Sequence, residues 1–162
     1  MTSRLEKGDT APSVSLPITP DGSVDISRPT AIGRIIYFYP RDNTPGCTLE
    51  GQEFSRLLPE FQSLGIDILG ISKDSLKKHA NFIEKQSLLI PLASDANGVA
   101  CEAFGVWVEK KMYGRVSMGI ERSTFLILQT GTIAAVWRKV KVKGHAEEVL
   151  KTARGLLETE PD

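Results

Sequence analysis

Cys47 is the residue whose place in the sequence most clearly indicates chemistry. It follows residues 34–39, a β-rich apolar run that predicts a buried strand, and it falls in the first turn of a helix predicted to begin near Thr44. The free amide groups and the positive dipole end of a helix stabilise an anion, and a thiolate is an anion. We therefore expect a reactive thiolate at Cys47, and the alternative is an inert buried thiol.

Two side chains near Cys47 can act on its sulfur. Thr44 precedes it by three residues and can turn its hydroxyl toward the sulfur. Glu50 follows it by three residues, one helical turn along, where it can hold a cation near the thiolate. The alternative for Glu50 is an acid that only favours the helix dipole. Ligands of open α/β sheets bind at the carboxyl ends of strands, where this helix is predicted to begin.

The second cysteine, Cys101, lacks such a setting. Two cysteines cannot build a disulfide framework or a four-cysteine zinc site, and neither has a histidine at ligand spacing, so the sequence predicts free thiols and no metal. In a short helix predicted over 95–104, Cys101 points roughly 130° away from the side that the apolar residues share. Those residues are Val99, Ala100, Ala103 and Phe104. We interpret Cys101 as a bystander thiol.

The remaining polar motifs favour surface roles. His79 and His145 lie among Lys and Glu residues on predicted helix faces, so both are expected to be solvated and neither to pair with a cysteine. The run from Arg138 to Lys143 alternates basic residues with valines. This run predicts a charged, solvated edge, and the alternative is a surface for an acidic partner. No glycine loop that could cradle a phosphate is present, so the sequence does not support a nucleotide enzyme.

Strand-like and helix-like segments alternate along the chain, and they must position these residues. The proline-rich first 30 residues predict a small N-terminal hairpin or an irregular lead-in. The later predicted strands cover 34–39, 66–71, 89–93, 121–128 and 133–137, and the predicted helices cover 44–64, 74–85, 95–104 and 146–157. Pro59 is expected to kink or split the first helix. This order predicts an α/β, thioredoxin-like fold with a central mixed sheet flanked by helices and an N-terminal hairpin extension.

Length and composition predict one globular domain over residues 1–162. Hydrophobic residues make up 41% and charged residues 25%, which excludes a disordered tail and a fibrous repeat. Basic and acidic residues balance at 20 each, so the charge recruits neither nucleic acid nor an anionic membrane. No apolar stretch approaches the roughly 18 residues of a membrane span, and Glu6 and Asp9 interrupt the region where a signal peptide is apolar. We expect a cytoplasmic protein, and a neutral, compact domain is compatible with a monomer.

The segment YFYPRDNTPGCTLE contains a P-x-x-x-T-x-x-C motif made by Pro40, Thr44 and Cys47. Two further segments are also informative, FGVW at 104–107 and GIERSTFLI at 119–127. On these motifs the chain resembles the peroxiredoxins, most closely the bacterioferritin comigratory protein or peroxiredoxin Q group, over nearly its whole length. The resemblance implies a thiol-dependent peroxidase.

The resemblance implies that Cys47 is the peroxidatic nucleophile. Its thiolate would attack one oxygen of hydrogen peroxide or an organic hydroperoxide and become a sulfenic acid. Thr44 would hydrogen-bond the sulfur or the peroxide. Arg122, on a neighbouring strand, would stabilise the thiolate and the charge that develops on the leaving oxygen, and its alternative is a surface residue flanking a strand. No cofactor is implied, because the peroxide bond is itself the oxidant.

Further roles around the same sulfur are also implied. The backbone N–H groups of Gly46 and Cys47 would add donors to the sulfur or the peroxide. Pro40 would cap the pocket and keep bulk water and larger thiols off the sulfur, and Glu50 would orient Arg122.

The sequence departs from the family at the position of a second, resolving cysteine. Many members carry it in the same helix or in the next one, where this chain has Gln52 and Ile83. We favour a one-cysteine peroxidase recycled by an external thiol such as thioredoxin, glutaredoxin or glutathione. The alternatives are a two-cysteine peroxidase with Cys101 as the resolving residue, and a thiol-exchange or binding protein on the same fold. The last is weakened because no C-x-x-C is present.

Overall fold

The computed structural model describes residues 4–158, so residues 1–3 and 159–162 of the predicted domain lie outside the described part of the chain. The strands are β1 (Ser15–Pro17), β2 (Ser23–Asp25), β3 (Gly33–Phe38), β4 (Ile66–Ser72), β5 (Leu92–Ser94), β6 (Trp107–Met112), β7 (Arg115–Ile120), β8 (Ser123–Leu128) and β9 (Ile133–Trp137). The helices are α1 (Pro45–Ser63), α2 (Leu76–Gln86), α3 (Val99–Ala103) and α4 (His145–Glu158).

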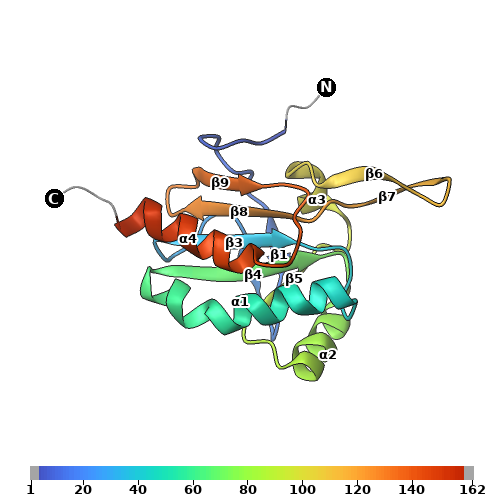
Figure 1. Ribbon diagram of the computed structural model, residues 1–162, viewed down its shortest axis with the longest axis horizontal. Helices are drawn as coiled ribbons and strands as arrows, with labels where there is room; N and C mark the ends of the chain where they lie inside the picture. Colours follow the sequence, from blue (N-terminus) through green and yellow to red (C-terminus); the bar gives the residue numbers. More distant parts are fainter. Residues whose placement is uncertain (1–3, 159–162) are drawn as a thin grey trace.

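Five strands form one mixed sheet in the order β5-β4-β3-β8-β9 (Figure 1). The central strand, β3, pairs parallel with β4 and antiparallel with β8. Every residue of β3 is buried, as expected of an apolar strand that is covered on both faces. The predicted α/β architecture, a mixed sheet flanked by helices, is confirmed.

Alternate side chains of β3 enter two separate hydrophobic cores, because successive residues of a strand point to opposite faces. Tyr37 packs in the core that includes residues of α1, α2 and α4, whereas Phe38 packs in the core that includes α3. Figure 1 shows α1 and α4 over the near face of the sheet. Cys47 belongs to the first core and Cys101 to the second, so the sheet lies between the two thiols.

The helix α1 carries the apolar stripe that the sequence predicted. Phe54, Leu57 and Phe61 are buried on it, and Pro45 occupies the start of the helix, where a missing N–H removes no helical hydrogen bond. Pro59 lies inside the continuous helix, so the predicted split is wrong. Burial of the stripe on both sides of Pro59 explains this, since packing supplies most of the stability of a helix in a protein.

Two hairpins lie outside the central sheet. β1 and β2 pair antiparallel and confirm the N-terminal hairpin. β6 and β7 form a second hairpin, which projects from the body of the molecule in Figure 1 and was not predicted. The charged run Glu109-Lys110-Lys111 breaks the apolar alternation that would have indicated β6. The turn of this hairpin is formed by Tyr113 and Gly114, which both have positive φ, as a two-residue hairpin turn of type I′ requires. Gly114 is the one residue of the turn that could have indicated the hairpin in the sequence.

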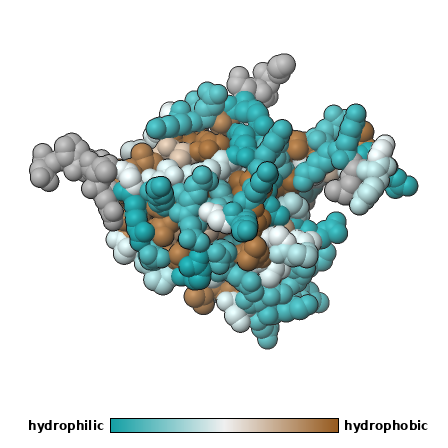
Figure 2. Space-filling view, viewed as in Figure 1, coloured by the Kyte–Doolittle hydropathy of each residue, from teal (hydrophilic) through white to brown (hydrophobic). Residues whose placement is uncertain are grey.

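Hydrophilic side chains cover most of the face shown in Figure 2, and apolar groups are visible between them. Among the residues that the structure describes, no helix combines the length and the apolar character needed to cross a membrane. The observed elements differ from the predicted ones mainly at their ends: α3 is shorter than 95–104, and the short edge strand β5 begins at Leu92 rather than at 89.

Candidate active site

Cys47 lies in the first turn of α1, just beyond the carboxyl end of the central strand β3, as the sequence predicted. Its side chain is 1% exposed. The first N–H groups of a helix have no partner within the helix, so the amides of Gly46 and Cys47 are available at this end. The thiol is therefore buried but lies beside backbone donors and the positive end of the α1 dipole.

Arg122 reaches the sulfur from the segment between β7 and β8. Its Nη2 lies 3.3 Å from the Sγ of Cys47, and its Nη1 donates to the Oε1 of Glu50 at 2.5 Å. One guanidinium thus bridges the thiol and the carboxylate. The structure brings together the three residues Cys47, Glu50 and Arg122, which lie up to 75 positions apart in the sequence.

The electrostatics of this cluster follow from its burial. Removal from water raises the pKa of Glu50 to about 7, although the charge and hydrogen bond of Arg122 oppose this. Burial also works against the charge on Arg122, but Glu50 and Cys47 outweigh it and raise the pKa of the guanidinium. Arg122 therefore stays charged and can stabilise an anion on the sulfur. The second oxygen of Glu50, Oε2, is buried without a hydrogen-bond partner among the described residues.

Thr44 and Pro40 occupy the loop between β3 and α1. The hydroxyl of Thr44 donates to the backbone oxygen of Arg41 at 2.9 Å, so its proton is engaged there, and the expected hydrogen bond to the sulfur or the peroxide stays a prediction. The lone pairs of that hydroxyl stay available to accept a hydrogen bond. Pro40 is exposed and follows the buried Tyr39.

Gly46 lies directly against the bridging guanidinium. A Cβ at this position would come within 3.3 Å of the Nη2 of Arg122 and 3.9 Å of the Val142 side chain. Glycine therefore lets Arg122 approach the first turn of α1 and reach the sulfur. The same spacing shows that the segment around Val142 borders the site.

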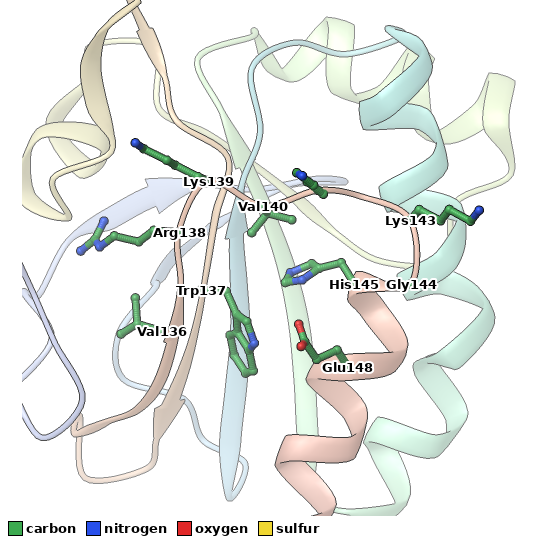
Figure 3. Close-up of a pocket in the computed structure, with 10 residues that line it drawn as sticks. Val136, Trp137, Arg138, Lys139, Val140, Lys143, Gly144, His145 and Glu148 are labelled. Atoms are coloured by element: carbon green, nitrogen blue, oxygen red, sulfur yellow. The ribbon is translucent and has the colours of Figure 1, made fainter.

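Figure 3 shows a cavity of about 570 Å³ between residues 136–144 and the start of α4. It adjoins the site through Val140, whose N–H donates to the backbone oxygen of Arg122 at 3.0 Å. Lys139, Lys141 and Lys143 are exposed along this segment, whereas Val140 and Val142 are partly buried. The exposed lysines agree with the predicted solvated run, but residues 138–144 form a loop after β9 and not a sheet edge, and Arg138 is partly buried over the Phe125 ring.

The prediction that His145 is solvated is wrong. It is 5% exposed, packs edge-on against Phe54 and Trp137, and its Nε2 lies 2.8 Å from the Oγ1 of Thr124. Burial and the positive charge of Arg122 lower the pKa of His145 to about 4, so its ring is neutral at pH 7. The first turn of α4 packs on the core. The charged residues that surround His145 in the sequence do not predict this contact.

The prediction that His79 is solvated is also wrong, because its side chain is fully buried. It contacts Asp42, which lies in the loop before Cys47 and is itself buried. No role was expected for Asp42 or Tyr39, although both belong to the segment that carries the P-x-x-x-T-x-x-C motif. Their position in this segment was the one feature of the sequence that could have indicated a role for them.

Cys101 is buried, which contradicts its predicted orientation away from the apolar side of its helix. It is 0% exposed, whereas Val99 is 55% exposed. The predicted wheel assumed a helix over 95–104, but α3 spans only Val99–Ala103 and Asp95 lies before it. The side of α3 that faces the core is therefore set by the Asp95 carboxylate, which accepts the N–H groups of Ala100 and Cys101 at 3.0 and 2.8 Å.

Within the described residues, no group of three His, Cys, Asp or Glu side chains could hold a metal ion.

Comparison with known proteins decides the family. A model of the AhpC/TSA family matches residues 7–136. The chain belongs to the AhpC/TSA family. Peroxiredoxin Bcp of Xanthomonas campestris pv. campestris is 49% identical over 142 residues, which cover 86% of this chain and 89% of that protein. Peroxiredoxin Bcp of Bacillus subtilis is 42% identical over 154 residues, which cover 95% of this chain and 98% of that protein.

Solved structures agree with this family assignment. A structure of the Xanthomonas campestris bacterioferritin comigratory protein, from work on its alkyl peroxide reduction activity, has a TM-score of 0.83 and 44% identity, with 89% of this chain and 92% of that chain covered. A cysteine-to-serine variant of Xylella fastidiosa PrxQ has a TM-score of 0.89 and 43% identity, with 96% of this chain and 99% of that chain covered. The predicted family, its thioredoxin-like fold and its thiol-dependent peroxidase activity are confirmed.

Proposed function

We propose that this thiol-dependent peroxidase reduces hydrogen peroxide and organic hydroperoxides through Cys47 and is recycled by an external thiol. The observation that supports the proposal is the bridging guanidinium, because Arg122 donates to both the Sγ of Cys47 and the Oε1 of Glu50. A donor already aimed at the sulfur needs no rearrangement when negative charge develops beside it.

The chemical step is a displacement at oxygen. The Cys47 thiolate forms an S–O bond with one peroxide oxygen, the O–O bond breaks, and the other oxygen leaves with the electron pair and takes up a proton as water or alcohol. The sulfur is oxidised by two electrons to a sulfenic acid and the peroxide is reduced. In this proposal Arg122 stabilises the thiolate and the leaving oxygen, and the amides of Gly46 and Cys47 add donors.

The remaining residues act on the geometry of this step. Thr44 uses its free lone pairs to accept a hydrogen bond from the peroxide, since its own proton is engaged by Arg41. Glu50 orients Arg122 through the shared guanidinium. Pro40 shields the mouth of the site, so that the buried sulfur meets small hydroperoxides before bulky thiols.

Recycling by an external thiol is supported by where Cys101 lies. Its side chain packs in the core on the opposite face of the sheet from Cys47, and a disulfide needs Cα atoms within about 7 Å. In the proposed route a thiol attacks the sulfenic acid and releases water, and a second thiol releases Cys47 and leaves as a disulfide. The proposal includes a thioredoxin, glutaredoxin or glutathione type of reductant, a reducing compartment such as the cytosol, and the monomer as the working unit.

The deciding experiment is intact-mass analysis after one equivalent of hydrogen peroxide, with dimedone present to trap sulfenic acid. The proposal expects one dimedone adduct, mapped to Cys47, and none in Cys47→Ser. Non-reducing peptide mapping of the wild type without dimedone would reveal any internal disulfide. A Cys47–Cys101 bridge in most molecules, together with loss of turnover in Cys101→Ser, would overturn the one-cysteine route and leave the peroxidase assignment intact.

A further inference from the structure

A second buried polar cluster involves the loop that carries Cys47, and the proposed mechanism does not use it. Asp42 is central to this cluster and is 7% exposed. Its Oδ1 accepts the hydroxyl of Tyr39 at 2.6 Å, and its Oδ2 lies 2.7 Å from the Nδ1 of His79. Each oxygen of this carboxylate thus has a partner, and both partners are themselves almost completely buried.

The hydrogen positions in this cluster follow from its acceptors. The Nε2 of His79 lies 2.9 Å from the backbone oxygen of Ala93, and a carbonyl oxygen can only accept, so Nε2 carries a hydrogen. The Nδ1 of His79 faces a carboxylate oxygen, so this contact also holds a proton. His79 and Asp42 therefore form a hydrogen-bonded pair in which each of their polar atoms has a partner, which is the condition under which buried polar groups are tolerated.

This pair connects three segments to the loop that carries Cys47. Tyr39 ends the strand side of the loop, His79 lies on α2, and Ala93 lies on β5. The main chain is held as well, because the N–H of Asp42 donates to the Oδ2 of Asp74 at 2.9 Å. Asp42 is thus fixed through both its carboxylate and its backbone. Only two residues separate it from Pro45, where α1 begins.

The consequence reaches the sulfur through the conformation of this short loop. Asn43, directly after Asp42, has a φ of 61°, in the left-handed region that non-glycine residues seldom adopt. Thr44 then donates to Arg41 across the same turn. Asparagine adopts this conformation more readily than other non-glycine residues, and the contacts of Asp42 further restrain the loop that contains it.

We propose that the Asp42–His79 pair is a positioning device for Cys47: it holds the loop from Pro40 to Gly46 so that the sulfur stays within reach of Arg122. The inference rests on the proposed role of Cys47. A displacement of about 1 Å at a reacting group can cost about 100-fold in rate, so a device this close to the nucleophile controls the reaction without touching the substrate. Asp42 and His79 are accordingly positioning residues and not catalytic ones.

The test compares Asp42→Asn, His79→Gln and the double variant by two reactions of Cys47. The first is oxidation by hydrogen peroxide, which needs the sulfur aligned with Arg122. The second is alkylation by iodoacetamide, which needs a reachable thiolate but no alignment with a leaving oxygen. Each single variant should oxidise about 10-fold more slowly, with alkylation unchanged or faster. The double variant should be no slower than the worse single one, because the two residues act as one unit.

Two controls separate positioning from general damage to the fold. Asp67→Asn breaks the ion pair between Asp67 and Arg34, whose Oδ1 and Nε atoms lie 2.7 Å apart at the start of β4. The Cys47 loop follows the carboxyl end of the sheet's parallel strands, so this variant should leave both reactions within twofold of the wild type even where it lowers the melting temperature. Tyr39→Phe removes the hydroxyl that donates to Asp42 and lies 3.5 Å from the Nδ1 of His79, but it keeps the ring and the Asp42–His79 contact. It therefore tests the network if the other variants fold poorly, with a smaller loss of oxidation rate expected.

The outcomes are distinct. Wild-type oxidation rates in folded variants, including Tyr39→Phe, or oxidation and alkylation that fall in parallel, would overturn the positioning role. If Cys47 of the wild type does not react with peroxide, the proposed function fails instead. A reactive wild type with unaffected variants would refute this inference alone.

Discussion

The two cysteines of this protein are almost equally buried but lie in opposite electrostatic surroundings. Cys47 is 1% exposed and Cys101 is 0% exposed. Arg122 donates to the sulfur of Cys47. At Cys101, burial, a hydrogen bond to Asp95 and the charge of that carboxylate all raise the pKa of the thiol.

This difference shows that burial alone does not decide whether a thiol reacts. Burial penalises a thiolate wherever it occurs, so the neighbouring charge determines which form is stable. A cation and the start of a long helix face Cys47, whereas a carboxylate faces Cys101. The first setting is the one that the proposed nucleophile needs, and the second keeps Cys101 in its thiol form.

The largest expected difference between the two cysteines is in peroxide reduction, and it is tested by replacing each thiol in turn. Cys47→Ser should abolish peroxide reduction, because a serine hydroxyl does not supply a stable anion at neutral pH. Cys101→Ser should retain peroxide reduction with glutathione, thioredoxin or a small dithiol as the reductant. Steady-state turnover and circular dichroism of both variants check this. Turnover that survives in Cys47→Ser would remove this residue from the mechanism.

The next effect concerns the charge beside the reactive thiol. Arg122→Ala should slow oxidation of Cys47 by about 10²–10³, the scale expected for losing one preorganised donor. Arg122→Lys should restore little, because a single ammonium cannot reproduce two fixed donors. Stopped-flow measurement of Cys47 oxidation checks both variants. A rate for Arg122→Ala within threefold of the wild type would contradict the proposed role.

The pH dependence of stability should separate the two buried groups that surround Arg122. The folded-state pKa of Glu50, about 7, is above its ordinary value of 4.5. Between these values the folded protein binds a proton that the unfolded chain has released, so Glu50 makes stability fall as pH rises. For His145 the pKa drops from 6.5 to about 4, and the unfolded chain holds the extra proton in that window, so His145 makes stability rise with pH.

Urea unfolding between pH 4 and 7 checks these signs, with the Glu50 effect expected from pH 4.5 upward. Relative to the wild type, Glu50→Gln should become progressively more stable as pH rises through this window. His145→Asn should change in the opposite direction between pH 4 and 6.5. Parallel curves for the wild type and Glu50→Gln would show that this carboxylate titrates at its ordinary value.

The smallest effect is expected at the unreactive cysteine. Asp95→Ala removes the acceptor of the N–H groups of Ala100 and Cys101. We expect the free energy of unfolding to fall by about 1–2 kcal/mol, as for the loss of a helix cap, with no change in the oxidation rate of Cys47. Ser75→Ala, which removes the cap of α2, is a matched control for the loss of stability. A changed oxidation rate in Asp95→Ala alone would mean that the two cysteines communicate across the sheet.

Local patterns in the sequence determined much of this protein. The apolar run before Pro40 became the central strand, and the Thr44-Pro45-Gly46 start became the helix that presents Cys47. Both depend on short-range physics, since periodicity, proline geometry and helix ends act over a few residues. Cys47 could be proposed as the reactive cysteine because its signals lie within one turn of chain. Its link to Arg122 came from resemblance to a family, not from spacing.

Tertiary structure alone decided the environments that lie far apart in the sequence. His79 and His145 have charged sequence neighbours but face the core, because each helix turns one side toward the sheet and the charged residues cover the other. Cys101 was assigned the wrong orientation for a similar reason, since Asp95 sets the start and the rotation of α3. The sheet between the two thiols and the contact of Asp42 with His79 are produced by packing, and no pattern in the sequence encodes a distance across a core.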